Sequence, residues 1–208
     1  MVKLYKNFNI KNNHKNSLIL IGNFDGVHLG HQKLFKLAKL YKKKYKLKIG
    51  VINFDPMPKM FFNKLLKNFR LSSINQKIQL LSKLKVDFII TKKFDKKFSK
   101  TKSINFINKI LNKKLKSKFI FVSNNFRFGN KREGNVDLLI KNEKKFNFKV
   151  VKPKPLIKQQ KIISSTLIRS LLEKGYLEKA NKLLDRNWTI EGKVQKGRQV
   201  GKKIGFPT

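Results

Sequence analysis

Two histidines three residues apart are the first candidates for chemistry in this sequence. His28 and His31 lie in IGNFDGVHLGHQKLF (21–35), in a chain with only 3 histidines. The segment follows an apolar run and opens an expected helix, whose first turn offers free backbone N–H groups and partial positive charge to a phosphate. Side chains three apart share one helix face. Two imidazole donors could therefore stabilise charge that grows in a phosphoryl-type transition state, and we assign both to catalysis.

The same loop contains other residues that suit a nucleotide. Gly22 and Gly30 let the backbone approach a ligand, and Phe24 and Asp25 lie between them. We assign these four residues to nucleotide binding, which the family resemblance given below specifies as ATP, with Asp25 as a water-mediated metal contact or a helix cap. A zinc helix of the HExxH type, a Walker A loop and a G-x-G-x-x-G motif are absent from the sequence. Capping or packing would explain an isolated H-x-G-H equally well, but its place between strand and helix favours phosphate binding.

A second candidate anion site is ISSTLIR (163–169). Ser164, Ser165 and Thr166 are good N-cap residues, and capping alone would explain one of them. Arg169 follows one turn later, so hydroxyls, helix N–H groups and a guanidinium could converge on an anion. Alone, the segment is explained as a cap and a surface arginine. Together with the first site it predicts a triphosphate held from two sides, so we assign the hydroxyl residues to ATP and the arginine to catalysis.

A third candidate, NNFRFGNKREG (124–134), suits a flat ring system that carries a phosphate. Phe126 and Phe128 alternate with Arg127, and Asn125 offers both a hydrogen-bond donor and an acceptor. Aromatic and cationic side chains at the end of a strand can hold such a ring. From this segment alone, the phenylalanines could equally be core residues beneath a loop.

Alternating strands and helices must position these three segments. Apolar runs predict strands at 17–22, 48–54, 86–91 and 118–123. Apolar residues spaced three and four apart predict helices around 34–41, 74–81, 104–111, 163–175 and 177–184. This alternation predicts an α/β fold with a doubly wound parallel sheet, whose ligands bind at the carboxyl edge of the strands. From Trp188 the sequence alternates β-type residues with glycines, which is typical of the first strands of a β-barrel.

Composition sets the class of protein. The chain has 208 residues, 40% of them hydrophobic, and no cysteine, which excludes disulfides and thiolate metal sites. It shows no secretory signal and no apolar run near the length of about 20 residues that spans a bilayer, so we expect a cytoplasmic protein without a membrane partner. The net charge is +40, but the basic residues are spread out and mostly lysine, as in proteins of AT-rich genomes. We therefore expect no specific nucleic-acid partner; the sequence leaves the oligomeric state open.

The motifs GNFDGVHLGHQ, FDPMP, FRFG, ISSTLIR and GFPT, in this order, resemble those of the bacterial bifunctional riboflavin kinase/FAD synthetase family. The resemblance implies an H-x-G-H nucleotidyltransferase domain at 1–184, which joins AMP from ATP to FMN with Mg²⁺. It implies the truncated beginning of a riboflavin kinase β-barrel at 185–208. It places His28 and His31 at the ATP phosphates and Asn125 on the flavin side. The flavin-binding residues that we expect are Phe54, Asn125, Phe126, Arg127 and Phe128.

Two departures from the family pattern matter. Met57 stands where the family usually has a histidine, and its side chain cannot donate to a phosphate, so that contact is lost or supplied elsewhere, as by Lys59. Most of the barrel that usually follows GFPT is missing, so we expect this chain to lack riboflavin kinase activity and to be a fragment or a truncated gene product. The alternatives are another H-x-G-H adenylyltransferase, acting on pantetheine phosphate or nicotinamide mononucleotide, and a basic nucleic-acid-binding protein. The FRFG loop and the barrel-like tail argue against the first, and the paucity of arginine against the second.

Overall fold

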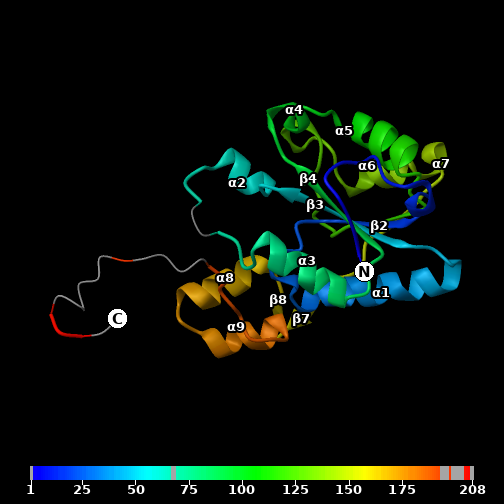
Figure 1. The fold of residues 1–208 in the computed structure, drawn as a ribbon. Coiled ribbons are helices and arrows are strands. Elements are labelled where there is room, and N and C mark those ends of the chain that lie inside the picture. Colours follow the sequence, from blue (N-terminus) through cyan, green and yellow to red (C-terminus); the bar gives the residue numbers. More distant parts are fainter. Residues whose placement is uncertain (1, 67–68, 193–196, 198–203, 207–208) are drawn as a thin grey trace.

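A six-stranded parallel sheet forms the centre of the molecule (Figure 1). The structure is a computed structural model that describes residues 2–66, 69–192, 197 and 204–206. The strand order is β1-β4-β3-β2-β5-β6, and every neighbouring pair is parallel. The strands are β1 (Lys3–Tyr5), β2 (Leu18–Ile21), β3 (Ile49–Asp55), β4 (Phe88–Lys93), β5 (Phe119–Phe121) and β6 (Lys149–Val151).

The predicted parallel α/β sheet is confirmed, and the structure adds two strands at its edges. Apolar runs predict β2, β3, β4 and β5 close to their observed bounds. They do not predict β1 and β6, which have three residues each and begin with a lysine. An edge strand of this length presents too few apolar residues to form a pattern, and short, charged edges discourage pairing with other chains.

Helices follow most strands. They are α1 (Leu29–Tyr45), α2 (Pro58–Phe62), α3 (Ile74–Lys83), α4 (Lys96–Ser99), α5 (Ser103–Asn105), the π-helix η3 (Phe106–Lys114), α6 (Val136–Lys141), α7 (Glu143–Phe146), α8 (Ser165–Glu173) and α9 (Leu177–Leu184). The five predicted helical segments correspond to α1, α3, η3, α8 and α9. Short 3₁₀ turns are η1 (Asn12–His14), η2 (Asp25–Val27) and η4 (Asn130–Arg132), and a small hairpin pairs β7 (Ile157–Lys158) with β8 (Lys161–Ile162).

The sheet is covered on both faces, as the doubly wound prediction requires. Successive side chains of a strand point to opposite faces. In β2, Leu18 and Leu20 pack in an apolar cluster with residues of α1 and α3, whereas Ile19 and Ile21 pack in a second cluster with residues of η3 and α6. Figure 1 shows α1 and α3 on one side of the sheet and α4 to α7 on the other.

Strand order brings the candidate motifs to one edge. β2 lies between β3 and β5, and the chain winds outward from this point in both directions. In doubly wound sheets, such a switch point leaves a crevice outside the carboxyl ends of the strands. The loop after β2 contains the H-x-G-H motif, the loop after β3 contains FDPMP, and the loop after β5 contains FRFG. All three motifs therefore lie at the same edge of the sheet.

The segment after α9 is attached to the sheet domain through two residues. The indole Nε1–H of Trp188 donates to the carbonyl of Leu71 at 2.9 Å, and the amide of Gln76 donates to the carbonyl of Thr189 at 3.1 Å. The described part of 185–208, namely 185–192, 197 and 204–206, contains no strand. The remainder of the predicted barrel segment lies outside the described residues. The barrel and the division at residue 184 stay predictions, and the two bonds place 188–189 against the first domain.

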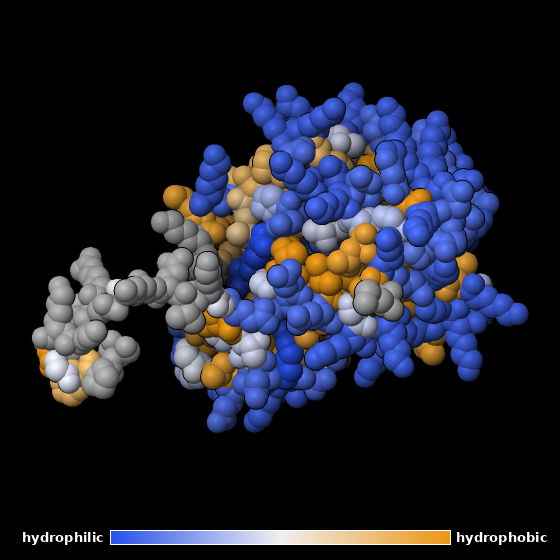
Figure 2. All heavy atoms as spheres, viewed as in Figure 1, coloured by the Kyte–Doolittle hydropathy of each residue, from blue (hydrophilic) through white to orange (hydrophobic). Residues whose placement is uncertain are grey.

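Hydrophilic side chains cover most of the face seen in Figure 2, with apolar patches between them. This surface agrees with a net charge of +40 that is spread along the chain rather than gathered in one motif. Among the helices that the structure describes, none is both long enough and apolar enough to cross a bilayer.

Candidate active site

The loop after β2 turns sharply before α1 begins. Phe24 adopts a left-handed backbone conformation with φ 47°, and Gly26 has φ 75°. His28 then takes an extended conformation as the N-cap of α1. Gly30 lies where an added Cβ would come within 3.0 Å of the carbonyl of residue 163 and 3.1 Å of the His28 ring. A glycine there lets the start of α1 approach the segment that leads to α8, so the two candidate anion sites become neighbours.

The two histidines are stacked rather than side by side. Their ring centroids lie 3.7 Å apart, and Nδ1 of His28 accepts the backbone N–H of His31 at 3.4 Å. This acceptor role places the proton of a neutral His28 ring on Nε2. The Phe24 ring meets His31 edge-on at 5.3 Å, and Nδ1 of His31 is buried without a hydrogen-bond partner in the described structure.

Burial keeps both rings neutral. Desolvation lowers the pKa of His28 to about 4, although Asp25 opposes the shift and Arg169 adds to it. Desolvation also lowers the pKa of His31 well below its ordinary value, and the nearby His28 and Lys77 contribute. Each ring therefore donates one N–H at neutral pH. A bound phosphate would be held by neutral donors here rather than by imidazolium cations.

Acid is expected to destabilise the fold through these histidines. Above pH 6.5, His28 is neutral in both the folded and the unfolded chain, so it contributes nothing to the pH dependence. Below pH 6.5, His28 is protonated in the unfolded chain, whereas in the folded chain it stays neutral until about pH 4. The free energy of unfolding should therefore fall over this window by about 3 kcal/mol from His28 alone. Urea unfolding at pH 7 and pH 4.5 measures the fall, and His28→Gln should reduce it; equal falls in both proteins would contradict this explanation.

A buried ion pair connects the H-x-G-H loop to α8. Arg169 donates to Asp25 Oδ2 at 2.7 Å, and the Asp25 side chain is only 2% exposed. The same carboxylate accepts the backbone N–H groups of Leu71 and Ser72 at 3.0–3.3 Å. The Arg169 guanidinium also donates from Nε to the carbonyl of Phe69 at 2.7 Å and lies 3.7 Å from the centre of the Phe69 ring. Three chain segments are held together by this pair.

This arrangement changes the expected role of Asp25. Its carboxylate does not cap α1, where His28 is the N-cap, and its oxygens are taken by Arg169 and two backbone amides. A carboxylate with these partners is a poor metal contact, direct or through water. In the part of the chain that the structure describes, no three acidic or histidine side chains gather closely enough to hold a metal ion.

The hydroxyl residues of ISSTLIR have separate roles. Ser164 is the N-cap of α8, and its Oγ accepts the N–H of Leu167 at 3.2 Å. Ser165 donates to the backbone carbonyl of Asp25 at 2.9 Å, which adds a second link between α8 and the first loop. Thr166 lines a cavity beside Arg169. One of the three hydroxyls is therefore committed to capping, as expected for a helix start.

A polar cavity of about 310 Å³ opens between the first loop and α8. Seven residues that we assigned to ATP or catalysis line it: Gly22, Phe24, Asp25, His31, Ser165, Thr166 and Arg169. His28, Gly30 and Ser164 do not line it; His28 lies behind His31, and the other two position the backbone. The other lining residues are Ile21, Asn23, Leu34, Met57, Lys59, Phe69 and Ser123.

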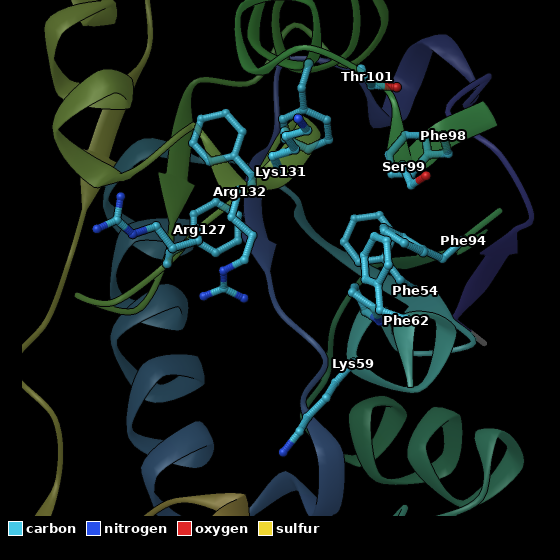
Figure 3. Close-up of a pocket in the computed structure, with 15 residues that line it drawn as sticks. Phe54, Lys59, Phe62, Phe94, Phe98, Ser99, Thr101, Arg127, Lys131 and Arg132 are labelled. Atoms are coloured by element: carbon cyan, nitrogen blue, oxygen red, sulfur yellow. The ribbon is translucent and has the colours of Figure 1, made fainter. Parts of the chain in front are cut away.

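An aromatic cavity of about 270 Å³ lies beyond the ends of β3 and β4 (Figure 3). Phe54, Phe126, Arg127 and Phe128 line it, and the rings of Phe126 and Phe128 stack at 5.4 Å. It is completed by Pro58, Lys59, Phe62, Phe94, Phe98, Ser99, Thr101, Phe106, Gly129, Lys131 and Arg132. The cavity therefore combines an apolar interior with cationic side chains at its rim, as a flat ring carrying a phosphate needs.

Asn125 does not line the aromatic cavity. It lines a neighbouring cavity that shares Phe126 and Arg127 with the aromatic one, and its Oδ1 accepts the Ser123 hydroxyl at 2.9 Å. In a loop, one step along the chain turns a side chain to a different side, so adjacency to Phe126 did not ensure a shared cavity.

Several side chains at the site were not assigned to it from the sequence. Met57 is buried and lines the polar cavity. Phe94 and Phe98, from the segment after β4, face the aromatic cavity, and two phenylalanines four residues apart at a strand end were the available signal. Lys77 of α3 is 1% exposed, and its Nζ has no hydrogen-bond partner among the described residues. A lysine on an apolar helix face is the only sequence sign of this buried charge.

Lys77→Met is expected to stabilise the fold. Desolvation lowers the pKa of the Lys77 ammonium, which means that burial on folding destabilises its charged form. Removing an unpaired buried charge should raise the free energy of unfolding by about 1–3 kcal/mol. Urea unfolding at pH 7 measures the change, with Lys83→Met at the exposed end of the same helix as the matched control. A variant less stable than the parent would show that the ammonium has a stabilising partner.

Comparisons with known proteins assign a family to this arrangement. The family model described as FAD synthetase matches residues 10–167, and the one described as riboflavin kinase matches residues 184–208. Three relatives carry the name bifunctional riboflavin kinase/FMN adenylyltransferase. Those of Buchnera aphidicola (subsp. Schizaphis graminum), Haemophilus influenzae and Escherichia coli K12 are 44%, 37% and 35% identical over 96%, 91% and 92% of this chain. The chain spans 64%, 62% and 61% of their lengths.

A solved structure agrees with the fold. A crystal structure described as a macrolide-efflux protein from Streptococcus pneumoniae superposes with a TM-score of 0.81 at 25% sequence identity. The match covers 99% of this chain and 67% of the other.

Proposed function

This chain belongs to the FAD synthetase family, and we propose that it transfers AMP from ATP to FMN, giving FAD and pyrophosphate. The family match over residues 10–167 carries the proposal, because it spans the loops after β2, β3 and β5 that line both cavities. The relatives' shared name includes FMN adenylyltransferase, which supplies the acceptor.

The two cavities support a division of the substrates. The ATP phosphates would occupy the polar cavity, where His31, Arg169 and the N-terminal ends of α1 and α8 offer donors. The flavin ring would occupy the aromatic cavity between Phe54 and the Phe126–Phe128 stack. This division favours FMN over pantetheine phosphate, which has no aromatic ring to fill that cavity.

The proposed reaction is a direct displacement. A phosphate oxygen of FMN forms a bond to the α-phosphorus of ATP, and the bond from that phosphorus to the bridging oxygen of the β-phosphate breaks. The electron pair leaves with pyrophosphate, and no proton has to move because the FMN phosphate is already anionic at neutral pH. Positioning and stabilisation of the added charge by neutral imidazole donors and Arg169 then account for the catalysis.

Magnesium enters this proposal as part of the substrate MgATP. The Asp25 carboxylate is already taken by Arg169 and backbone amides, so the residues of this site suit contacts to phosphate oxygens rather than to a metal. Mg²⁺ typically keeps water and substrate phosphates as ligands, which fits a site without a protein cage.

Finer assignments rest on the same family. We place the sheet domain with the H-x-G-H nucleotidyltransferases because of the order in which its motifs follow β2, β3 and β5. The match at residues 184–208 supports the beginning of a riboflavin kinase barrel there. A cytoplasmic location is where an enzyme using ATP and FMN would find its substrates.

One assay tests the activity. The purified chain is incubated with FMN and MgATP, and FAD and pyrophosphate are quantified; we expect equal amounts of the two products. Phosphopantetheine and nicotinamide mononucleotide replace FMN in parallel reactions, and riboflavin replaces it in a fourth that tests the kinase expectation. Adenylylation of one of the first two acceptors in place of FMN would overturn the proposal, as would the absence of FAD.

A further inference from the structure

Lys59 lies where the polar and aromatic cavities meet. Among the residues that the structure describes, it is the one that lines both cavities. Its position follows from the chain: β3 ends at Asp55, Met57 is buried as the N-cap of α2, and Lys59 comes in the first turn of that helix. Figure 3 shows its stem beside the aromatic cavity, with the ammonium turned away from Phe54 and Phe62.

The Lys59 ammonium and the Arg169 guanidinium lie over the same aromatic ring, but only the guanidinium has an anionic partner among the described residues. The Lys59 Nζ lies 4.9 Å from the centre of the Phe69 ring, on which the Arg169 guanidinium also stacks at 3.7 Å. Arg169 is paired with Asp25 at 2.7 Å, whereas Lys59 forms no ion pair within the described residues. Its side chain is exposed. An unpaired cation at the junction of two cavities is available to a ligand that enters from either one.

Charge makes this position important to the proposed reaction. Two phosphate groups, one from each substrate, must approach within bonding distance, and their like charges repel. The histidines beside the polar cavity are neutral, and the charge of Arg169 is balanced by Asp25. A further positive charge where the phosphates meet would reduce this repulsion, in addition to the Mg²⁺ that arrives with ATP.

We propose that the Lys59 ammonium binds the FMN phosphate and the ATP α-phosphate together and so acts as a catalytic residue. The inference rests on the proposed function and assigns a residue to its reacting atoms. The ammonium keeps its proton while the FMN oxygen bonds to the α-phosphorus and pyrophosphate departs. Met57 lines the polar cavity without a hydrogen-bond donor, and Lys59 is the one side chain of α2 that can donate to a phosphate.

Lys59→Met and Lys59→Arg test the assignment, with Lys64→Met as the matched control because Lys64 is also exposed and lines neither cavity. We expect Lys59→Met to lower kcat for FAD formation about a hundredfold, Lys59→Arg to retain most of it, and Lys64→Met to match the parent. Thermal unfolding monitors the fold, and little change is expected from an exposed position.

A binding measurement separates this inference from the proposed function. Titrating flavin fluorescence gives the preference of the protein for FMN over riboflavin, which differ by the phosphate alone. Lys59→Met should reduce this preference at least tenfold, whether or not the parent protein makes FAD. The absence of FAD formation in the parent would overturn only the proposed function. A variant that keeps both kcat and the preference overturns the inference. A variant that loses rate but keeps the preference places the ammonium on ATP alone and overturns the shared contact.

Discussion

Arg169→Met is expected to lower the free energy of unfolding by about 3–5 kcal/mol and to remove most adenylyl transfer. The substitution keeps the bulk of the side chain but leaves the Asp25 carboxylate, 2% exposed, without its counter-ion. It also removes the donor to the Phe69 carbonyl and the stacking contact on the Phe69 ring. Because Asp25 holds the 71–72 backbone, the wall of the polar cavity should loosen as well. Urea unfolding and the FAD assay measure the two losses.

A second substitution separates the effect of the unpaired Asp25 carboxylate from the effect of the lost Arg169 contacts. Asp25→Asn combined with Arg169→Met removes the unpaired carboxylate, so the double variant should be no less stable than Arg169→Met alone. FMN affinity should stay within a few-fold of the parent value, because Arg169 does not line the aromatic cavity. A loss of less than about 1 kcal/mol in Arg169→Met would mean that the pair behaves as an exposed one.

The positions of the motifs were predictable because they depend on the sheet alone. Four apolar runs identify four of the six strands, and the strand-end loops of a parallel sheet must meet at one edge. The doubly wound arrangement then brings the H-x-G-H loop, FDPMP and FRFG together without any knowledge of side-chain packing. The family resemblance read from the same motifs is confirmed by the family model over residues 10–167.

Side-chain directions were not predictable from spacing. The i, i+3 argument treats His28 and His31 as members of one helix, but His28 is the N-cap, with φ −67° and ψ 171°. Its extended backbone places its ring beneath the His31 ring instead of beside it on the cavity wall. Asn125 differs for a related reason, since irregular loops have no period from which a side chain's direction follows.

The cations of the site show a second limit. Lys77 is one of 51 basic residues and nothing local marks it, whereas Lys59 stands out only as a cation two residues from Met57. Their importance comes from packing: α2 begins where two cavities join, and α3 buries one lysine next to the H-x-G-H loop. Sequence reasoning that discounts lysines as solvated helix faces misses Lys77, and it could not place Lys59 at the junction of two cavities.

His31→Ala is expected to lower kcat for FAD formation by about a hundredfold to a thousandfold, the effect of removing one preorganised donor from a growing charge. Its ring lines the polar cavity, and burial keeps it neutral, so we expect it to bind phosphate as an N–H donor. His14→Ala is the matched control. His14 is also buried, but it hydrogen-bonds Tyr5 at 2.8 Å and lines neither cavity, so its loss should affect stability and leave kcat near the parent value.

The comparison with His28 decides whether stacking or direct contact matters. His28 does not line the cavity, and it acts on His31 through the 3.7 Å stack and the hydrogen bond to the His31 backbone. His28→Phe should keep a stacked ring but lose the acceptor, so we expect a smaller fall in kcat than in His31→Ala. If both donors instead contact phosphate, the two variants should lose equal rate. Full activity in His31→Ala would contradict the assignment of this loop to ATP.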